Sequence, residues 1–206
     1  MKILAVSDHV SDAVYSGDIG GRFGDVDLVL SCGDLPYSYL EYIVSMLNKP
    51  SFYVHGNHDS PEYRASGITL TEPGGWVNLH GRVAEAKGVL LAGLEGSLRY
   101  KPRVPFQYTE REMAWKVRAM TPALLMNRLR YGRYLDILIT HSPPYGIHDG
   151  EDLPHRGFRA FLDLLDRFKP RYLLHGHKHV YGPEPTHTRY ADTEVINVYP
   201  FRVIEY

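Results

Sequence analysis

Short runs of apolar residues recur along the chain, and each run ends in polar or turn-forming residues. Runs rich in Val, Ile and Leu with such boundaries are typical of buried strands. Six strands are predicted in this way, at residues 3–7, 27–31, 51–55, 89–92, 135–140 and 172–175. Segments with helical spacing lie between several of them, at residues 36–48 and 157–168. Repeated alternation of strand and helix predicts parallel strands.

Two further segments predict antiparallel strands. Residues 84–89 favour a hairpin that turns at Lys87 and Gly88, and residues 194–206 alternate apolar and polar positions with Pro200 as a break. A mixed α/β fold of two packed sheets with helices outside accounts for the whole pattern better than one doubly wound sheet.

The segment from Thr109 to Tyr131 predicts helix. Thr109 followed three residues later by Glu112 is a capping box, and Thr121-Pro122 restarts the pattern. We therefore expect two helices, roughly 110–120 and 122–132. Three leucines of the second helix are expected to face inward: Leu124, Leu125 and Leu129.

The composition is that of one ordinary globular domain, spanning residues 1–206, with 44% hydrophobic and 23% charged residues. No stretch is long and uncharged enough to cross a bilayer, so we expect a soluble protein with no membrane partner. The lone Cys32 cannot form an internal disulfide, which indicates a reducing compartment, and we expect a cytoplasmic location.

Charge is distributed unevenly, although the formal net charge is only −1. The segment from Arg99 to Arg133 holds nine Lys or Arg residues against only Glu110 and Glu112. Such a segment can steer an anionic substrate, and a solvated helical surface explains it equally well. Nucleic acid therefore stays open as a partner.

Polar clusters stand where five of the predicted strands end. They contain Asp8, Asp34, Gly56-Asn57-His58-Asp59, His141 and Gly176-His177-Lys178-His179. Because ligand sites of parallel sheets lie beyond the carboxyl ends of the strands, these clusters can converge. Carboxylates, an amide oxygen and imidazoles without a thiolate suit manganese, iron, zinc or cobalt, and suit magnesium alone less well.

Each cluster also has a simpler explanation when it is taken alone. Gly33-Asp34 is more often a turn, Gly56-Asn57-His58-Asp59 is a plausible turn, and His141 is more often a hydrogen-bonded core histidine. His177 and His179 are harder to dismiss, because residues two apart on an extended segment face the same way. The ordered combination of all five favours a metal site.

A site of this kind predicts hydrolysis of phosphate esters. Two cations roughly 3.5–4 Å apart clamp the attacking and leaving oxygens and lower the pKa of a water that becomes the nucleophile. His58 follows the ligand candidate Asn57, so it is the expected general acid for the leaving oxygen.

These blocks resemble the calcineurin-like metallophosphoesterase superfamily, whose pattern runs D-x-H, G-D, G-N-H-D or E, a His after a strand, then G-H-x-H. The resemblance spans Val6 to His179 and implies a four-layer sandwich of two facing mixed sheets flanked by helices. It implies Asp34 as the bridging ligand and His58 as the proton donor. It implies Asn57, His141 and His177 as ligands of one metal, with Asp8 and His179 as ligands of the other. Residues 93–97 and 140–150 resemble small stand-alone members of phosphodiesterase type.

One position departs from the family pattern. Val10 stands where the first block has a histidine ligand, and His9 is the only candidate substitute there. We therefore hypothesise that the metal site of Asp8, Asp34 and His179 is weakened and completed by water, and that the enzyme works with one tightly held ion.

The expected function is hydrolysis of a small phosphodiester, with a nucleotide as one option. A phosphomonoesterase or a nuclease is the alternative within the class, and a catalytically weak protein-binding scaffold of the same fold is the alternative outside it. Arg99, His148 and His155 are candidate substrate contacts, and Tyr100 is a similar candidate. The sequence leaves the oligomeric state open.

Overall fold

The computed structural model describes residues 1–206, and its strands form two large sheets. The first sheet has the order β15-β1-β2-β3-β6, with bounds Phe201–Glu205, Lys2–Val6, Leu28–Ser31, Ser51–Tyr53 and Val77–Asn78. The second has the order β13-β14-β12-β11-β8-β7, with bounds His187–Tyr190, Thr193–Asn197, Tyr172–His175, Ile137–Thr140, Val89–Leu94 and Val83–Ala86. Two small ribbons pair β4 (Glu62–Tyr63) with β5 (Thr69–Leu70), and β9 (Ser97–Leu98) with β10 (Gln107–Tyr108).

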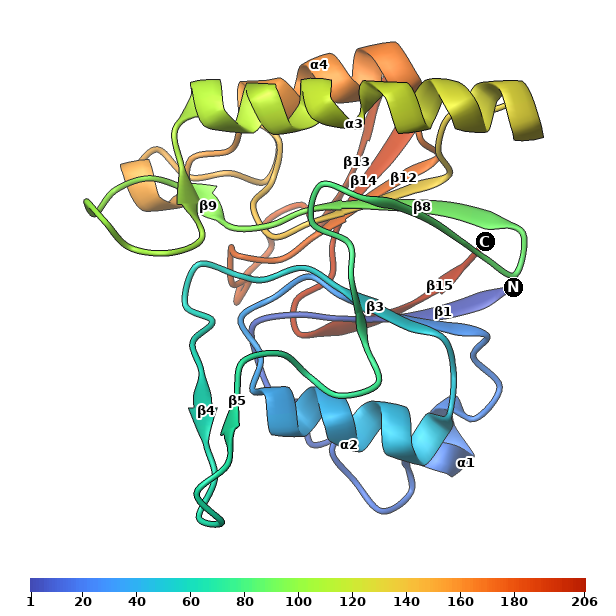
Figure 1. Cartoon of the computed structure of the whole chain (residues 1–206), viewed down its shortest axis with the longest axis vertical. Helices are drawn as coiled ribbons and strands as arrows, with labels where there is room; N and C mark the ends of the chain where they lie inside the picture. Colours follow the sequence, from blue (N-terminus) through green and yellow to red (C-terminus); the bar gives the residue numbers. More distant parts are fainter.

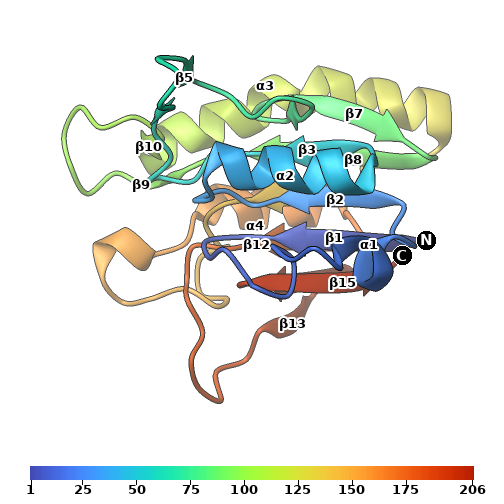
Figure 2. The same ribbon diagram turned by 90° about the horizontal axis from the view of Figure 1, so that it is seen from below.

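Helices cover the outer face of each sheet. The four α-helices are α1 (Ile19–Phe23), α2 (Tyr37–Leu47), α3 (Glu110–Tyr131) and α4 (Arg159–Phe168), and a 3₁₀ turn, η1, spans Leu153–His155. Figure 1 shows α1 and α2 below the first sheet and α3 and α4 above the second. Figure 2, seen from below, shows α2 lying in front of the first sheet and running along its strands. The predicted mixed α/β sandwich of two facing sheets flanked by helices is confirmed. No helix combines the length and the apolar character that crossing a membrane requires.

All six predicted strands are present, with ends displaced by at most two residues. The predicted hairpin is also present, because β7 and β8 pair antiparallel around Lys87 and Gly88, both at positive φ (51° and 82°). Two central residues at positive φ match the right-handed twist of the flanking strands. The last two strands divide between the sheets: β14 pairs with β12 and β13, whereas β15 pairs antiparallel with β1.

The prediction of two helices around Pro122 was wrong, because α3 runs unbroken through it. A proline inside a helix costs about 3 kcal/mol through a lost hydrogen bond and a steric clash. The observed capping box at Thr109 and the left-handed cap at Gly132 stabilise the two ends. Met113, Val117, Met120 and Leu124 then bury one continuous stripe that extends on both sides of the proline.

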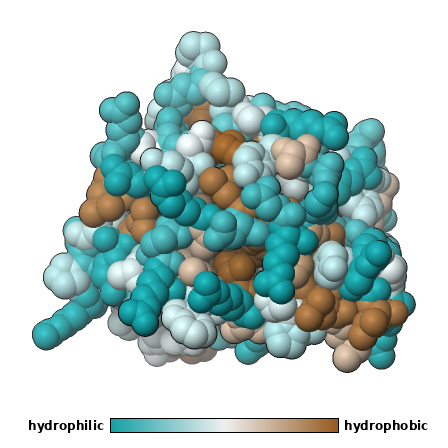
Figure 3. Space-filling view, turned by 90° about the horizontal axis from the view of Figure 1, so that it is seen from above, coloured by the Kyte–Doolittle hydropathy of each residue, from teal (hydrophilic) through white to brown (hydrophobic).

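The inward orientation was right for Leu124 and wrong for Leu125 and Leu129. Leu124 is fully buried, whereas Leu125 and Leu129 are 45% and 82% exposed. Each helical residue turns by about 100°, so neither leucine shares the buried stripe. Figure 3 views the molecule from above, the side that α3 and α4 cover, and shows apolar side chains gathered near the end of α3.

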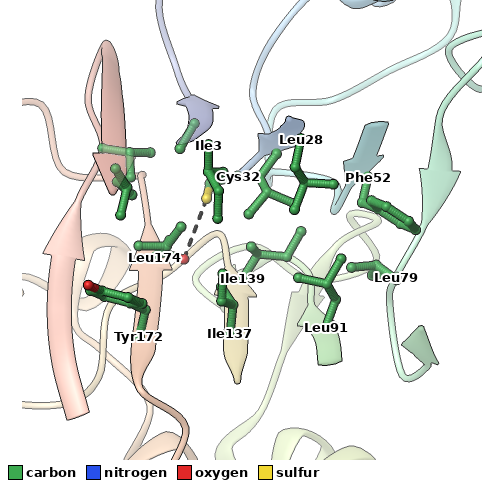
Figure 4. Close-up of a cluster of buried hydrophobic side chains, with 14 of the residues drawn as sticks. Ile3, Leu28, Cys32, Phe52, Leu79, Leu91, Ile137, Ile139, Tyr172 and Leu174 are labelled. Atoms are coloured by element: carbon green, nitrogen blue, oxygen red, sulfur yellow. Dashed lines mark hydrogen bonds between the residues drawn. The ribbon is translucent and has the colours of Figure 1, made fainter. Parts of the chain in front are cut away.

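The core lies in three layers between these elements. A cluster of 18 buried residues fills the space between the two sheets. Figure 4 shows Ile3, Leu28 and Phe52 of the first sheet facing Leu91 and Ile139 of the second. Separate clusters lie beneath α3 and α4, and between α1, α2 and the first sheet. This packing fixes the sheets against each other, so the loops that follow their strands keep fixed positions.

Candidate metal centre

The strands β1, β2, β3, β11 and β12 run parallel within their sheets and end on one side of the molecule. In Figure 1, β1 begins beside the N label at the right, and the loops after these strands gather at the left. The residues that follow the strand ends include Asp8, Asp34, Asn57, His141 and His177. The topology thus brings the polar clusters of the sequence to a common edge.

Four of these side chains meet around one point. Nε2 of His141 lies 2.9 Å from Oδ1 of Asn57, 3.3 Å from Oδ2 of Asp34 and 3.0 Å from Nδ1 of His177. Ligand atoms about 2.1 Å from a shared ion lie roughly 3.0–3.4 Å from one another in tetrahedral or octahedral geometry. The observed separations therefore fit a single cation among the four atoms.

The hydrogen bonds on the far side of each ring decide which atoms carry lone pairs. Nδ1 of His141 lies 2.8 Å from the carbonyl of Cys32, and Nε2 of His177 lies 2.7 Å from the carbonyl of Pro154. A carbonyl only accepts, so these ring nitrogens donate, and a neutral ring then presents its other nitrogen as an acceptor. Nδ2 of Asn57 donates to the Tyr100 hydroxyl at 3.2 Å, which turns Oδ1 toward the same point. With both rings neutral, four acceptor atoms face one another, and a cation between them would stabilise this arrangement.

The pKa shifts of these groups show the same demand for positive charge. Burial opposes ionisation of His141, but the Asp34 carboxylate outweighs it and raises the pKa of His141 to about 9. Burial likewise opposes ionisation of Asp34, but His141 lowers the pKa of Asp34 to about 2. Burial and the neighbouring His141 lower the pKa of His177 to about 4. The site thus favours one positive charge, which a divalent metal supplies more fully than a proton.

Asp8 and His179 border this centre. Both carboxylate oxygens of Asp8 accept the backbone N–H of His177 at 2.9–3.1 Å, and Nε2 of His179 lies 3.7 Å from Asp8 Oδ1. The structure therefore places Asp8 and His179 together, in the same pocket as Asp34 and His177.

His9 and Val10 lie apart from this group. The His9 side chain is exposed, and its ring faces that of Tyr199 with centroids 6.3 Å apart. Val10 is partly buried and packs against the core beneath the first sheet. His9 is also absent from the lining of the pocket that contains Asp8 and His179.

The backbone is unusual at the predicted ligands. Asp8, Asp34 and His177 have φ values of 62°, 56° and 68°, a region that non-glycine residues seldom adopt. Two neighbouring glycines allow close approach. A Cβ on Gly56 would lie 1.9 Å from Asp34 Oδ1, and one on Gly176 would lie 2.2 Å from Asp8 Oδ2.

A pocket of about 430 Å³ opens onto these residues. It is lined by Asp8, Asp34, His58, Gly150, Asp152, His155, His177, Lys178 and His179. His58 is exposed, and its backbone N–H donates to Asp34 Oδ1 at 2.8 Å. Its imidazole is therefore held at the mouth of the pocket by the segment that also carries Asn57.

The three candidate substrate contacts divide between this pocket and other places. His155 lines the pocket, with its Nδ1 2.6 Å from Asp152. The Arg99 guanidinium instead pairs with Glu112 at 2.8 Å, and the His148 ring contacts His175 and Thr188. Neither Arg99 nor His148 lines the pocket.

Sequence reasoning missed several residues of the site. Lys178 and Asp152 line the pocket, and the carbonyls of Cys32 and Pro154 fix the orientation of two rings. Lys178 could have been found from its place between His177 and His179. No sequence signal marks a backbone carbonyl.

Comparison with known proteins relates this chain to one family of enzymes. A family model described as calcineurin-like phosphoesterase matches residues 1–181. An uncharacterised protein of Haemophilus influenzae is 28% identical over 62% of this chain, and the match covers 61% of that protein. The match thus spans about three fifths of the length of that curated relative.

Solved structures share the fold. The crystal structure of TT1561 of Thermus thermophilus is 22% identical, with a TM-score of 0.64, and the match covers 96% of this chain and 88% of that one. GAP50, described as the anchor in the inner membrane complex of Plasmodium, is 12% identical, with a TM-score of 0.52, over 96% of this chain and 70% of that one. At these identities the likeness concerns the fold alone.

Proposed function

The chain belongs to the calcineurin-like phosphoesterase family, and from this premise we propose that residues 1–206 act as one phosphodiesterase domain. Membership of the family supports metal-dependent hydrolysis of phosphate esters in general. The observation that carries the proposal is the position of three acceptor atoms around His141 Nε2, at separations of 2.9–3.3 Å, which fits a divalent cation among the four atoms.

The proposed ligands fall into two groups. Asp34, Asn57, His141 and His177 would hold one cation, and Asp8, His179 and the shared Asp34 would hold a second. Manganese, iron, zinc and cobalt suit this set of oxygen and nitrogen donors. When bound, such cations polarise the phosphoryl oxygens and make a water nucleophilic near neutral pH.

The chain's own groups would bind the ester and move the proton. His58 at the pocket mouth would donate a proton to the departing oxygen, because it is exposed to substrate and tied through its backbone to Asp34. His155 and Lys178 in the pocket wall would contact the phosphate oxygens. Asp152 would orient the His155 ring from 2.6 Å.

The surroundings of Asp8 support a weaker second site. Val10 packs into the core and His9 faces Tyr199, so neither adds an imidazole beside Asp8 and His179. Calorimetric titration of metal-free protein with Mn²⁺ should therefore give one tight and one weak ion, unchanged in His9→Ala. Two equally tight ions would contradict this.

The catalytic assignment can be tested with paired aryl substrates. With Mn²⁺ present, bis(p-nitrophenyl) phosphate should be hydrolysed faster than p-nitrophenyl phosphate, and the reverse order would favour a monoesterase. His58→Asn should slow the diester reaction by about 10²–10⁴-fold, the usual contribution of a general acid. His187→Asn is the matched control, because His187 is exposed and pairs with Glu194 outside the pocket.

Two results would count against the proposal. Equal rates for His58→Asn and the unaltered chain would remove the role of His58. Metal binding without hydrolysis of either substrate would favour the scaffold alternative. The nuclease alternative has less support, because no residue of the basic helix α3 lines the pocket.

A further inference from the structure

Helix α3 carries a second apolar stripe, on the side that faces away from the core. Trp115, Leu125, Met126 and Leu129 are 58%, 45%, 58% and 82% exposed. With Pro122, which is also exposed, they recur at intervals of three, four and seven residues and so form one face of the helix. The stripe extends for about 21 Å along the axis at 1.5 Å per residue.

This concentration differs from the rest of the surface. Thirteen large hydrophobic side chains of the chain are exposed, and five of them lie between Trp115 and Tyr131. Isolated exposed apolar residues need no explanation, whereas a contiguous patch rimmed by polar groups marks an interaction surface. Figure 3 shows apolar side chains among hydrophilic ones at the lower right of this face, where α3 ends.

The stripe carries positive charges that have no acid partner: Arg111 and Arg118 share its face, and Arg128 and Arg130 lie on either side of it. Arg111, Arg118, Arg128 and Arg130 are all exposed. The arginine ion pairs of the chain involve five other residues: Arg22, Arg64, Arg99, Arg133 and Arg189.

The two acids of α3 are engaged elsewhere. Glu110 accepts the backbone N–H groups of Arg159 and Ala160, and Glu112 pairs with Arg99. The outer face of α3 therefore combines apolar side chains with four unbalanced positive charges, which complement an anionic partner.

We propose that this face docks the protein on the surface of an anionic lipid bilayer. An amphipathic helix with Trp and Leu on its apolar side and arginines at its edges lies at the boundary between headgroups and acyl chains. Such docking needs no helix that spans the membrane. The proposal replaces the expectation from sequence that no membrane partner exists.

The shape and charge of the face argue against other occupants. A protein partner that presents a helix usually binds in a groove, whereas α3 is an outermost ridge in Figure 1 and lines none of the five main pockets. A second copy of this chain would bring the same four arginines against each other. Nucleic acid would pair with the arginines but would leave Leu125, Met126 and Leu129 in water.

Vesicle sedimentation with the full chain tests the proposal. The chain should sediment with vesicles of phosphatidylcholine mixed with phosphatidylglycerol and much less with phosphatidylcholine alone. Binding should weaken as salt is added, because screening acts on exposed charges.

Variants of exposed residues separate the contribution of positive charge to vesicle binding from that of apolar contact, without disturbing the core. Arg118→Gln with Arg128→Gln should weaken binding by roughly thirtyfold, as expected for two surface cations. Leu125→Gln with Leu129→Gln should weaken it by at least about tenfold through lost apolar contact.

Ile68→Gln is the matched control. Ile68 is 55% exposed and lies in the β4–β5 hairpin, at the bottom of Figure 1, whereas α3 is at the top. This variant should bind vesicles like the unaltered chain. Circular dichroism should show the same helix content in all variants.

Three outcomes would overturn the proposal. One is a chain that ignores anionic vesicles at low salt. Another is unchanged binding in both double variants. The third is a dimer, detected by light scattering, that becomes monomeric only in the variant with Leu125→Gln and Leu129→Gln. In that case the apolar face would bind a second copy of the chain.

Discussion

Gly56→Ala should displace a predicted metal ligand without removing any functional group. The added Cβ would lie 1.9 Å from Asp34 Oδ1 and 2.5 Å from the Asp34 backbone nitrogen. Real Cβ atoms essentially never come closer than 3.0 Å to such neighbours, so the carboxylate must move by at least 1.1 Å, the difference between 3.0 and 1.9 Å. Metal–ligand distances tolerate only about 0.2 Å, so Asp34 would leave the ligand set.

Two magnitudes follow from this displacement. Loss of a supporting group beyond the ligands already costs about 10–100-fold in metal affinity, so loss of Asp34 itself should cost about 100-fold or more. Overpacking of this kind costs about 1–3 kcal/mol in folding free energy. For a chain of this size, the melting temperature should fall by about 2–12 °C.

Calorimetric titration with Mn²⁺ and thermal unfolding of the metal-free protein measure the two effects separately. Gly182→Ala is the matched control, because a Cβ there meets no atom within 4 Å. It should keep both the affinity and the melting temperature. Metal affinity equal to that of the unaltered chain in Gly56→Ala would refute the placement of Asp34 as a ligand.

Three further predictions concern other contacts. Tyr100→Phe removes the acceptor of the Asn57 amide and should weaken Mn²⁺ binding about two- to twelvefold in calorimetry, the value of one hydrogen bond; unchanged affinity would argue against this orienting role. Leu124→Ala should lower the free energy of unfolding, measured in urea, by about 2–5 kcal/mol, and Leu129→Ala should lower it by less than about 0.5 kcal/mol. Equal losses would contradict the burial of Leu124 and the exposure of Leu129. Burial, reinforced by Lys116, lowers the pKa of His80 to about 4. Between pH 6.5 and 4 the unfolded chain therefore binds more protons than the folded chain, and the free energy of unfolding decreases as the pH is lowered. His80→Gln should flatten that part of the curve in urea unfolding across pH, and an unchanged slope would exclude His80 as its source.

The fold was predictable where the local pattern agreed with tertiary packing. Strands such as residues 172–175 are buried on both faces, so a continuous apolar run marked them without ambiguity. Prediction failed at Pro122, because the core stripe on both sides of it outweighs its local cost. It also failed at Leu125 and Leu129, because an apolar residue type does not by itself imply burial and both residues lie off the buried stripe of α3.

The convergence of several polar clusters was predictable from the sequence, whereas the geometry of the site was not. The order of polar clusters after strands identified the group that the structure brings together around His141. Long side chains were harder to place, since Arg99 reaches Glu112 at the start of α3 instead of the pocket. The backbone carbonyls that orient the imidazoles could not be predicted, because every residue type carries such a carbonyl.

The positive φ angles of Asp8, Asp34 and His177 have a consequence for engineering. Each costs roughly 1–2 kcal/mol for a residue with a side chain, and glycine would remove that cost. A selection for thermal tolerance alone would thus favour glycine at the three positions that the proposed chemistry can least spare. At this edge of the sheets, substitutions that raise thermal stability should therefore lower activity. Stabilising substitutions are better sought in the interior of the sandwich and on the hairpins.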